Sequence, residues 1–101
     1  MRSKEPRELL NLARSLFESN EDLKLFLIGG LAAQNIYASM EVRKTSGIDI
    51  LTTREDAERL VGRMRNNGYG TFYNPDLGEY SVFKHDEGIH IDIYQGGIGG
   101  Y

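Results

Sequence analysis

The sequence predicts an α/β protein in which helices pack on a mixed β-sheet. Apolar residues recur at helical spacing in three segments, short apolar runs lie between these segments, and the last third alternates apolar and polar residues. The elements are expected in the order α-β-α-β-α-β-β-β. The 101 residues fit a single domain, 1–101, with a flexible glycine-rich tail from about residue 95.

The first helix is expected over residues 4–19. Ser3 is in place to cap it, and Pro6 is tolerated in a first helical turn. The apolar positions follow the helical period at Leu9, Leu12, Ala13, Leu16 and Phe17.

A buried strand is predicted over residues 23–28, where only Lys24 interrupts the apolar run. It ends at Gly29 and Gly30, and a second helix follows with one apolar face: Ala33, Ile36, Tyr37 and Met40. A polar connection, 41–46, then leads to a second strand around 48–51.

The third helix has the clearest limits. Thr52 opens it, and Thr52 with Glu55 has the spacing of a capping box. Gly68 is placed to cap its end. The apolar face consists of Ala57, Leu60, Val61 and Met64.

Three strands are expected after this helix, at 70–73, 79–85 and 89–94. A turn at residues 74–78 separates the first two. Asp86, Glu87 and Gly88 turn the chain back, so the last two strands are expected to form a hairpin.

The composition narrows the class of protein. The chain has no cysteine, so it has neither a disulfide framework nor a thiolate metal site. The net charge of −3 gives no strong nucleic-acid signal. The charged start, residues 1–6, is unlike a signal peptide, and the longest apolar run is too short to span a bilayer. A cytoplasmic protein without membrane association is expected.

Gly29 and Gly30 form the first candidate site. A glycine pair between a strand and a helix lets a phosphate approach the backbone, and the helix N-terminus offers free amides. The alternative is an ordinary tight turn.

Asp49 forms the second candidate site. Residues two apart share a face of a strand, so Ile48 and Ile50 point to the core and Asp49 points away from it. A carboxylate on an open face suits magnesium, which takes carboxylates together with substrate phosphates. Alternatively, Asp49 is solvated or paired with Arg43 or Lys44.

Asp92 forms the third candidate site. Alternation places it on one face with His90, opposite Ile89, Ile91 and Ile93. Asp92 is a candidate metal ligand or a general base for an attacking hydroxyl. The alternative is the polar outer face of an edge strand.

Together, these sites would place an anion cradle beside two carboxylates at one edge of the sheet. Metal-assisted phosphoryl or nucleotidyl transfer needs such a set, because the cation neutralises the phosphates and a carboxylate activates the acceptor.

These residues resemble a known family. The stretches Leu27-Ile28-Gly29-Gly30-Leu31-Ala32, Arg43-x-Thr45-x-x-Ile48-Asp49-Ile50 and Ile91-Asp92-Ile93 are similar to the minimal nucleotidyltransferase superfamily, in the branch that includes the AbiEii-type toxins. The resemblance covers about residues 23–94. It implies a Mg²⁺ site and transfer of a nucleoside monophosphate from a nucleoside triphosphate (NTP) to a hydroxyl group.

The resemblance also implies roles for individual residues. Two Asp residues one position apart and a third on a later strand bind magnesium in that family. Asp49 and Asp92 match the second and third, whereas Gly47 takes the place of the first. Gly29 and Gly30 would then bind the nucleotide, and Lys44 would steady its triphosphate.

Three hypotheses follow. The chain is an active nucleotidyltransferase, in which His90 stands in for the missing ligand; or it is a degenerate domain that binds a nucleotide or a protein partner; or it is an interaction domain with surface acids. The third hypothesis would assign the aromatic side chains of Tyr69, Phe72, Tyr73 and Tyr80 to a partner surface.

Overall fold

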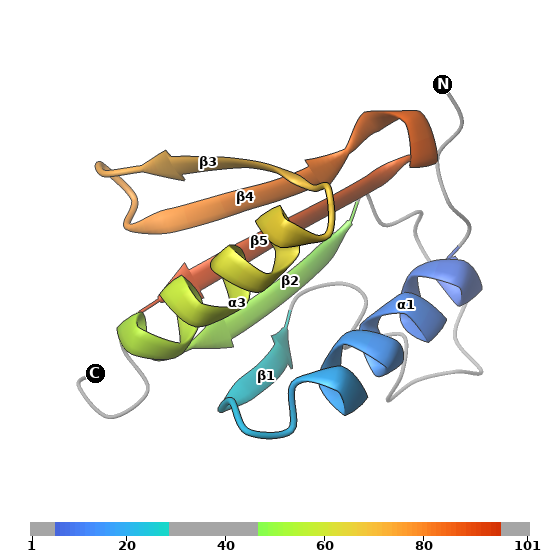
Figure 1. Cartoon of the computed structure of the whole chain (residues 1–101), viewed down its shortest axis with the longest axis horizontal. Helices are drawn as coiled ribbons and strands as arrows, with labels where there is room; N and C mark the ends of the chain where they lie inside the picture. The colour runs from blue at the N-terminus through green and yellow to red at the C-terminus, as the bar shows by residue number, and fades with distance from the viewer. Residues whose placement is uncertain (1–5, 29–46, 96–101) are drawn as a thin grey trace.

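A five-stranded mixed sheet with helices on one side forms the fold (Figure 1). The structure, a computed structural model of the chain, describes residues 6–28 and 47–95. Its elements are α1 (Pro6–Ser19), β1 (Leu25–Ile28), β2 (Ile48–Thr52), α3 (Arg54–Asn66), β3 (Gly70–Asn74), β4 (Glu79–Lys84), the short 3₁₀ turn η1 (His85–Glu87) and β5 (Ile89–Gln95). This confirms the predicted α/β class. The predicted second helix and Ser3 lie outside the described residues.

The strand order is β1-β2-β5-β4-β3. Strands β2 and β5 run parallel, and the other three neighbouring pairs are antiparallel. The last strand therefore lies between β2 and β4 in the interior of the sheet, which the linear order of elements does not indicate. In the described part of the chain, no helix is long and apolar enough to cross a membrane.

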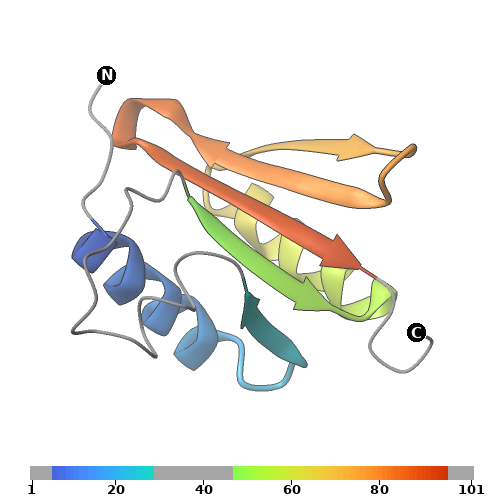
Figure 2. The same ribbon diagram turned by 180° about the vertical axis from the view of Figure 1, so that it is seen from behind.

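One face of the sheet carries the hydrophobic core. Helix α3 lies in front of the sheet in Figure 1 and behind it in Figure 2, so it covers a single face. Helix α1 packs on the same side, against Leu27, whose register partner is Ile50. The buried apolar side chains are Leu9, Ala13, Leu23, Ile48, Ile50, Ala57, Leu60, Val61, Met64, Val82, Ile89, Ile91 and Ile93.

The start of α3 differs from the prediction by one residue. Thr53, not Thr52, is the N-cap, and its hydroxyl accepts a hydrogen bond from the Asp56 amide at 3.2 Å. Thr52 is the fully buried last residue of β2, and its hydroxyl donates to the Lys24 carbonyl at 2.6 Å. A hydroxyl already engaged across the sheet is not free to cap a helix.

The end of α3 confirms the predicted role of Gly68. Its φ of +89° is in the left-handed region that favours glycine. Its amide donates to the Arg65 carbonyl, and the next amide, of Tyr69, donates to the Met64 carbonyl at 3.1 Å. These two bonds are those of a Schellman motif, which satisfies carbonyls left free at a helix end.

Strand β1 begins later, and is less buried, than the apolar run predicts. Leu23 is buried, but its amide donates to the Asn20 carbonyl in a turn, and the Lys24 amide donates to the Asp56 carboxylate at 2.9 Å. Because β1 is an outer strand of the described sheet, Phe26 stays 51% exposed. The expectation of a buried strand over 23–28 was therefore wrong at its start and on one face.

The two hairpins follow the predicted order with small shifts in their limits. Strands β4 and β5 pair antiparallel, as expected, around η1 and Gly88, whose φ is +67°. His85 belongs to η1 rather than to the preceding strand, β3 extends to Asn74 and β5 extends to Gln95.

Candidate functional site

The second face of the sheet carries the polar residues singled out by the sequence. Ile48 and Ile50 are fully buried, whereas Asp49 between them is only half-buried. The same alternation holds on β5, where Asp92 lies between the fully buried Ile91 and Ile93. We call this surface the open face, because α3 lies behind the sheet in Figure 2 and α1 packs against Leu27 on that same side, within residues 6–28 and 47–95.

The two carboxylates lie opposite each other. Asp49 and Asp92 are register partners on the parallel strands β2 and β5, which lie next to each other in Figure 2. Neighbouring strands are about 4.8 Å apart, so these side chains share one small region of the open face. Since β5 is an interior strand, the alternative that Asp92 decorates an edge strand was wrong.

Asp92 is held by two neighbours. The Ser81 hydroxyl on β4 donates to Oδ1 of Asp92 at 3.2 Å, and Nε2 of His90 lies 3.0 Å from the same oxygen. Both contacts follow from the sheet, since Ser81 is the register partner of Asp92 and His90 is two residues before it. One oxygen of the carboxylate is thereby fixed.

Asp49 has a different environment. Its Oδ1 accepts a long hydrogen bond from the Tyr94 hydroxyl at 3.4 Å. Burial, and then the negative charge of Asp92, raise the pKa of the Asp49 carboxyl above its usual 3.8. Burial and the nearby Asp49 and Asp92 charges raise the pKa of the Tyr94 hydroxyl to about 12. The region therefore carries excess negative charge that a cation would relieve.

A divalent cation suits this donor chemistry. Magnesium prefers oxygen ligands and is commonly held by one or two carboxylates, with substrate phosphates and water completing its shell. Asp49 and Asp92 supply two such carboxylates. Within the described ranges, no group of three or more His, Asp or Glu side chains is arranged to hold a metal ion. Among the described residues, the protein's contribution to such a site would be this carboxylate pair.

Gly47 has a steric reason to be glycine. A Cβ at this position would overlap the backbone carbonyl oxygen of His90 on the neighbouring strand. No side chain, carboxylate included, fits at position 47 unless β2 and β5 move apart. The glycine is thus part of how the two strands approach each other, a feature that the sequence does not reveal.

The structure brings together some of the predicted site residues. Asp49 and Asp92 lie on one surface with His90, as alternation predicted, and their chemical roles stay predictions. Gly29, Gly30 and Lys44 lie outside the described residues, as do Arg43 and the whole stretch 29–46.

Sequence reasoning missed two residues of the site, Ser81 and Tyr94. Tyr94 continues the alternation of His90 and Asp92 and was open to the same argument. Ser81 needed the register of the β4–β5 hairpin, which η1 sets and which a sequence pattern alone does not fix.

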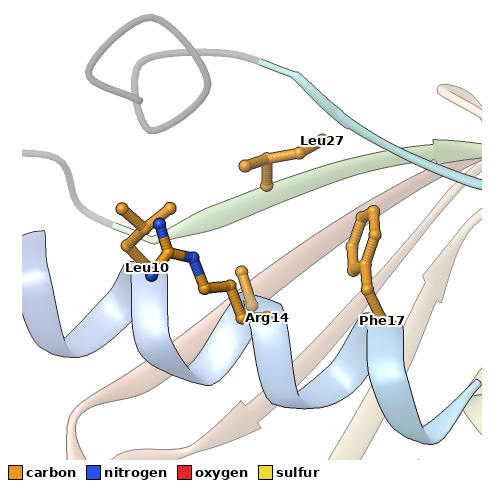
Figure 3. Close-up of a pocket in the computed structure, with 5 residues that line it drawn as sticks. Leu10, Arg14, Phe17 and Leu27 are labelled. Atoms are coloured by element: carbon orange, nitrogen blue, oxygen red, sulfur yellow. The ribbon is translucent and has the colours of Figure 1, made fainter. Parts of the chain in front are cut away.

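A groove of about 210 Å³ lies elsewhere, between α1 and β1. Figure 3 shows Leu10, Arg14 and Phe17 on α1 facing Leu27 across it, and Ala13 also lines it. Because Leu27 points to the helix-covered side of the sheet, this groove is separate from the carboxylates. Among the described residues, its lining is mainly apolar and includes no carboxylate.

Comparison with known proteins identifies the family. A family described as uncharacterised nucleotidyltransferase matches residues 6–97, which covers the sheet, both described helices and all the open-face residues. No curated protein and no solved structure matches the chain. The match extends over nearly the whole length and agrees with the mixed α/β fold, and the chain belongs to this family of uncharacterised nucleotidyltransferases.

Proposed function

We propose that the protein transfers a nucleoside monophosphate from an NTP to a hydroxyl acceptor, with Mg²⁺ bound at the open face. The acceptor oxygen would bond to the α-phosphorus as the bond to the β-phosphate breaks and pyrophosphate leaves. The pairing of Asp49 with Asp92 on adjacent parallel strands carries this proposal. Two half-buried carboxylates that face each other, with His90 bonded to Asp92 but no described lysine or arginine bonded to either of them, are costly to the fold unless they hold a cation.

Asp49 and Asp92 would have different roles in the proposed reaction. Asp49 and Asp92 would hold Mg²⁺, which when bound neutralises phosphate charge and orients the reacting group. Asp92, whose Oδ1 is fixed by Ser81 and His90, has Oδ2 left to contact the cation or to accept the proton of the attacking hydroxyl.

The groove beside α1 is a less suitable site for the reaction. In the described residues its lining is mainly apolar, and it lies on the other side of the sheet from the carboxylates. An NTP and a protein partner are the partners expected from the sequence, and we place both proposed binding sites next to the aspartates.

A second function is favoured by Gly47. Position 47 holds a glycine, and no side chain fits there, so the chain lacks the first of the three carboxylates that the family resemblance implies. A domain with two carboxylates would bind an NTP with Mg²⁺ but transfer it slowly or not at all. It would then act as a nucleotide- or protein-binding module.

A label-transfer assay tests the proposal. The purified protein is incubated with each of the four NTPs labelled at the α-phosphate, with Mg²⁺, and with pooled cellular protein, RNA and small molecules as acceptors. Label transferred to an acceptor is expected, and Asp92→Asn should reduce it by about 100-fold or more, the size of comparable electrostatic contributions to catalysis. Leu51→Ala, a change on the same face of β2, is the control and should transfer normally.

The outcomes separate the two functions. Transfer that needs Mg²⁺ and Asp92 supports the enzyme. Nucleotide binding that needs Mg²⁺, without transfer to any acceptor, supports the binding module. Transfer that survives loss of both aspartates would contradict a site at the open face.

A further inference from the structure

The side chain nearest to the missing carboxylate position belongs to His90. A Cβ built on Gly47 would overlap the backbone carbonyl oxygen of His90 and would lie 3.6 Å from Cβ of His90, in ordinary van der Waals contact. The His90 side chain therefore begins beside the position that a side chain at residue 47 would take.

The imidazole is directed at the site rather than at solvent alone. It is 52% exposed, yet its Nε2 lies 3.0 Å from Oδ1 of Asp92. A histidine that only faced solvent would rotate freely and would not keep this nitrogen at hydrogen-bond distance from Asp92. The second bond to the same oxygen, from Ser81, shows that Oδ1 is used for support, since no described residue donates to Oδ2.

We propose that His90 compensates for Gly47 by acting as a positioning residue, which holds Oδ1 of Asp92 so that Oδ2 stays available to a divalent cation. This inference rests on the proposed function and adds to it a residue that the family resemblance does not assign. Outer partners that orient metal-binding carboxylates typically contribute 10- to 100-fold in metal affinity.

The chemistry of the His90 imidazole suits a positioning role better than direct binding of the metal. Magnesium prefers oxygen donors to imidazole nitrogen. The nitrogen nearest to the site already contacts the carboxylate, and within the described residues His90 forms no three-membered metal-binding group with the aspartates.

The test measures metal affinity directly. Binding of Mn²⁺ is followed by electron paramagnetic resonance in the presence of a non-hydrolysable ATP analogue, and Mg²⁺ affinity is obtained by competition. His90→Ala is expected to weaken both metals by about 10- to 100-fold. His90→Gln should keep affinity within about threefold, because its amide nitrogen is the same number of bonds from Cβ as Nε2 and can donate to Oδ1.

A matched control is available in the same chain. His85 lies in η1 with its ring 4.7 Å from that of Phe83 and has no contact with either aspartate. His85→Ala should leave metal affinity unchanged. A melting curve for each variant shows whether it folds, and a purely structural role of His90 would alter melting without altering metal affinity.

The outcomes are distinct. If the native protein binds no Mn²⁺ up to several millimolar, or if Asp49→Asn binds it equally well, the proposed function fails. If the native protein binds Mn²⁺ through Asp49 and His90→Ala binds it equally well, only the role of His90 fails. If His90→Ala weakens the affinity for Mn²⁺ but leaves the affinity for Mg²⁺ unchanged, His90 is a metal ligand. That result would also overturn the positioning role.

Discussion

The two faces of the sheet use the same strands for opposite purposes. Toward the helices, β2 and β5 present Ile48, Ile50, Ile91 and Ile93, none of which has exposed surface. Toward the open face, the same strands present two carboxylates that repel each other. The comparison shows how one alternating sequence pattern stabilises the fold on one side and concentrates unfavourable charge, usable for binding a cation, on the other.

The largest expected effect comes from breaking the helix-covered face. Ile91→Ala removes a fully buried side chain at the centre of the sheet and should lower the free energy of unfolding by roughly 2–5 kcal/mol. Asp92→Asn, one residue later on the other face, should lower it by less than about 1 kcal/mol, because an amide oxygen can still accept from Ser81. Urea denaturation, monitored by circular dichroism, measures the free energy of unfolding of both variants. Equal losses of stability would contradict the conclusion that the helix-covered face stabilises the fold and the open face does not.

A pair of glycines tests the contact between β2 and β5. Gly47→Ala forces a methyl group against the His90 carbonyl and should destabilise the fold by roughly 1–3 kcal/mol. Gly62→Ala is the matched change within α3, where nothing lies within 4 Å of an added Cβ, and it should stabilise the fold by about 0.5–1 kcal/mol. The melting temperatures of the two variants measure these effects. A Gly47→Ala variant as stable as the native protein would show that the strands tolerate a side chain there.

The same contact affects the design of a gain-of-function experiment. Gly47→Asp, which would introduce the carboxylate that the family resemblance implies, would place its Cβ in the same overlap with the His90 carbonyl. Lack of activity in that variant would therefore not distinguish a degenerate site from a distorted one. Changes at Asp49, Asp92 and His90 avoid this difficulty.

The smallest expected effect concerns the charge on the open face. Because the pKa of the Asp49 carboxyl is raised in the folded protein, the native state loses stability as pH rises from below 3.8 through that raised value. Asp49→Asn carries no such charge. In buffer with EDTA it should be more stable than the native protein at pH 7, and the gain should disappear below pH 3.8.

The measurement is the difference in melting temperature between the two proteins across this pH range. An Asp49→Asn variant that is less stable than the native protein at pH 7 would show that the aspartate pair is not strained in the absence of metal.

The periodicity of the sequence predicted which side chains share a face. Asp49 between two isoleucines and Asp92 between two others were placed correctly, because a strand has a fixed period of two. Gly68 was also placed correctly, because a helix end in the left-handed conformation favours glycine.

Other features depend on contacts between distant segments. The N-cap is Thr53 rather than Thr52 because the Thr52 hydroxyl donates to the carbonyl of Lys24, the residue just before β1. The interior place of β5 and the tight approach of Gly47 to His90 also result from strand pairing. Local propensities do not encode such pairings, so neither Ser81 nor the reason for Gly47 could be predicted.

Both proposed functions require the open face to bind an NTP with a divalent cation. We would titrate the isotopically labelled protein with non-hydrolysable ATP and GTP analogues, with and without Mg²⁺, and monitor the backbone amide shifts by NMR. We predict Mg²⁺-dependent shifts at Asp49, Ser81 and Asp92. Shifts confined to the α1 groove at Leu10 and Leu27, or no shifts at millimolar nucleotide, would contradict it.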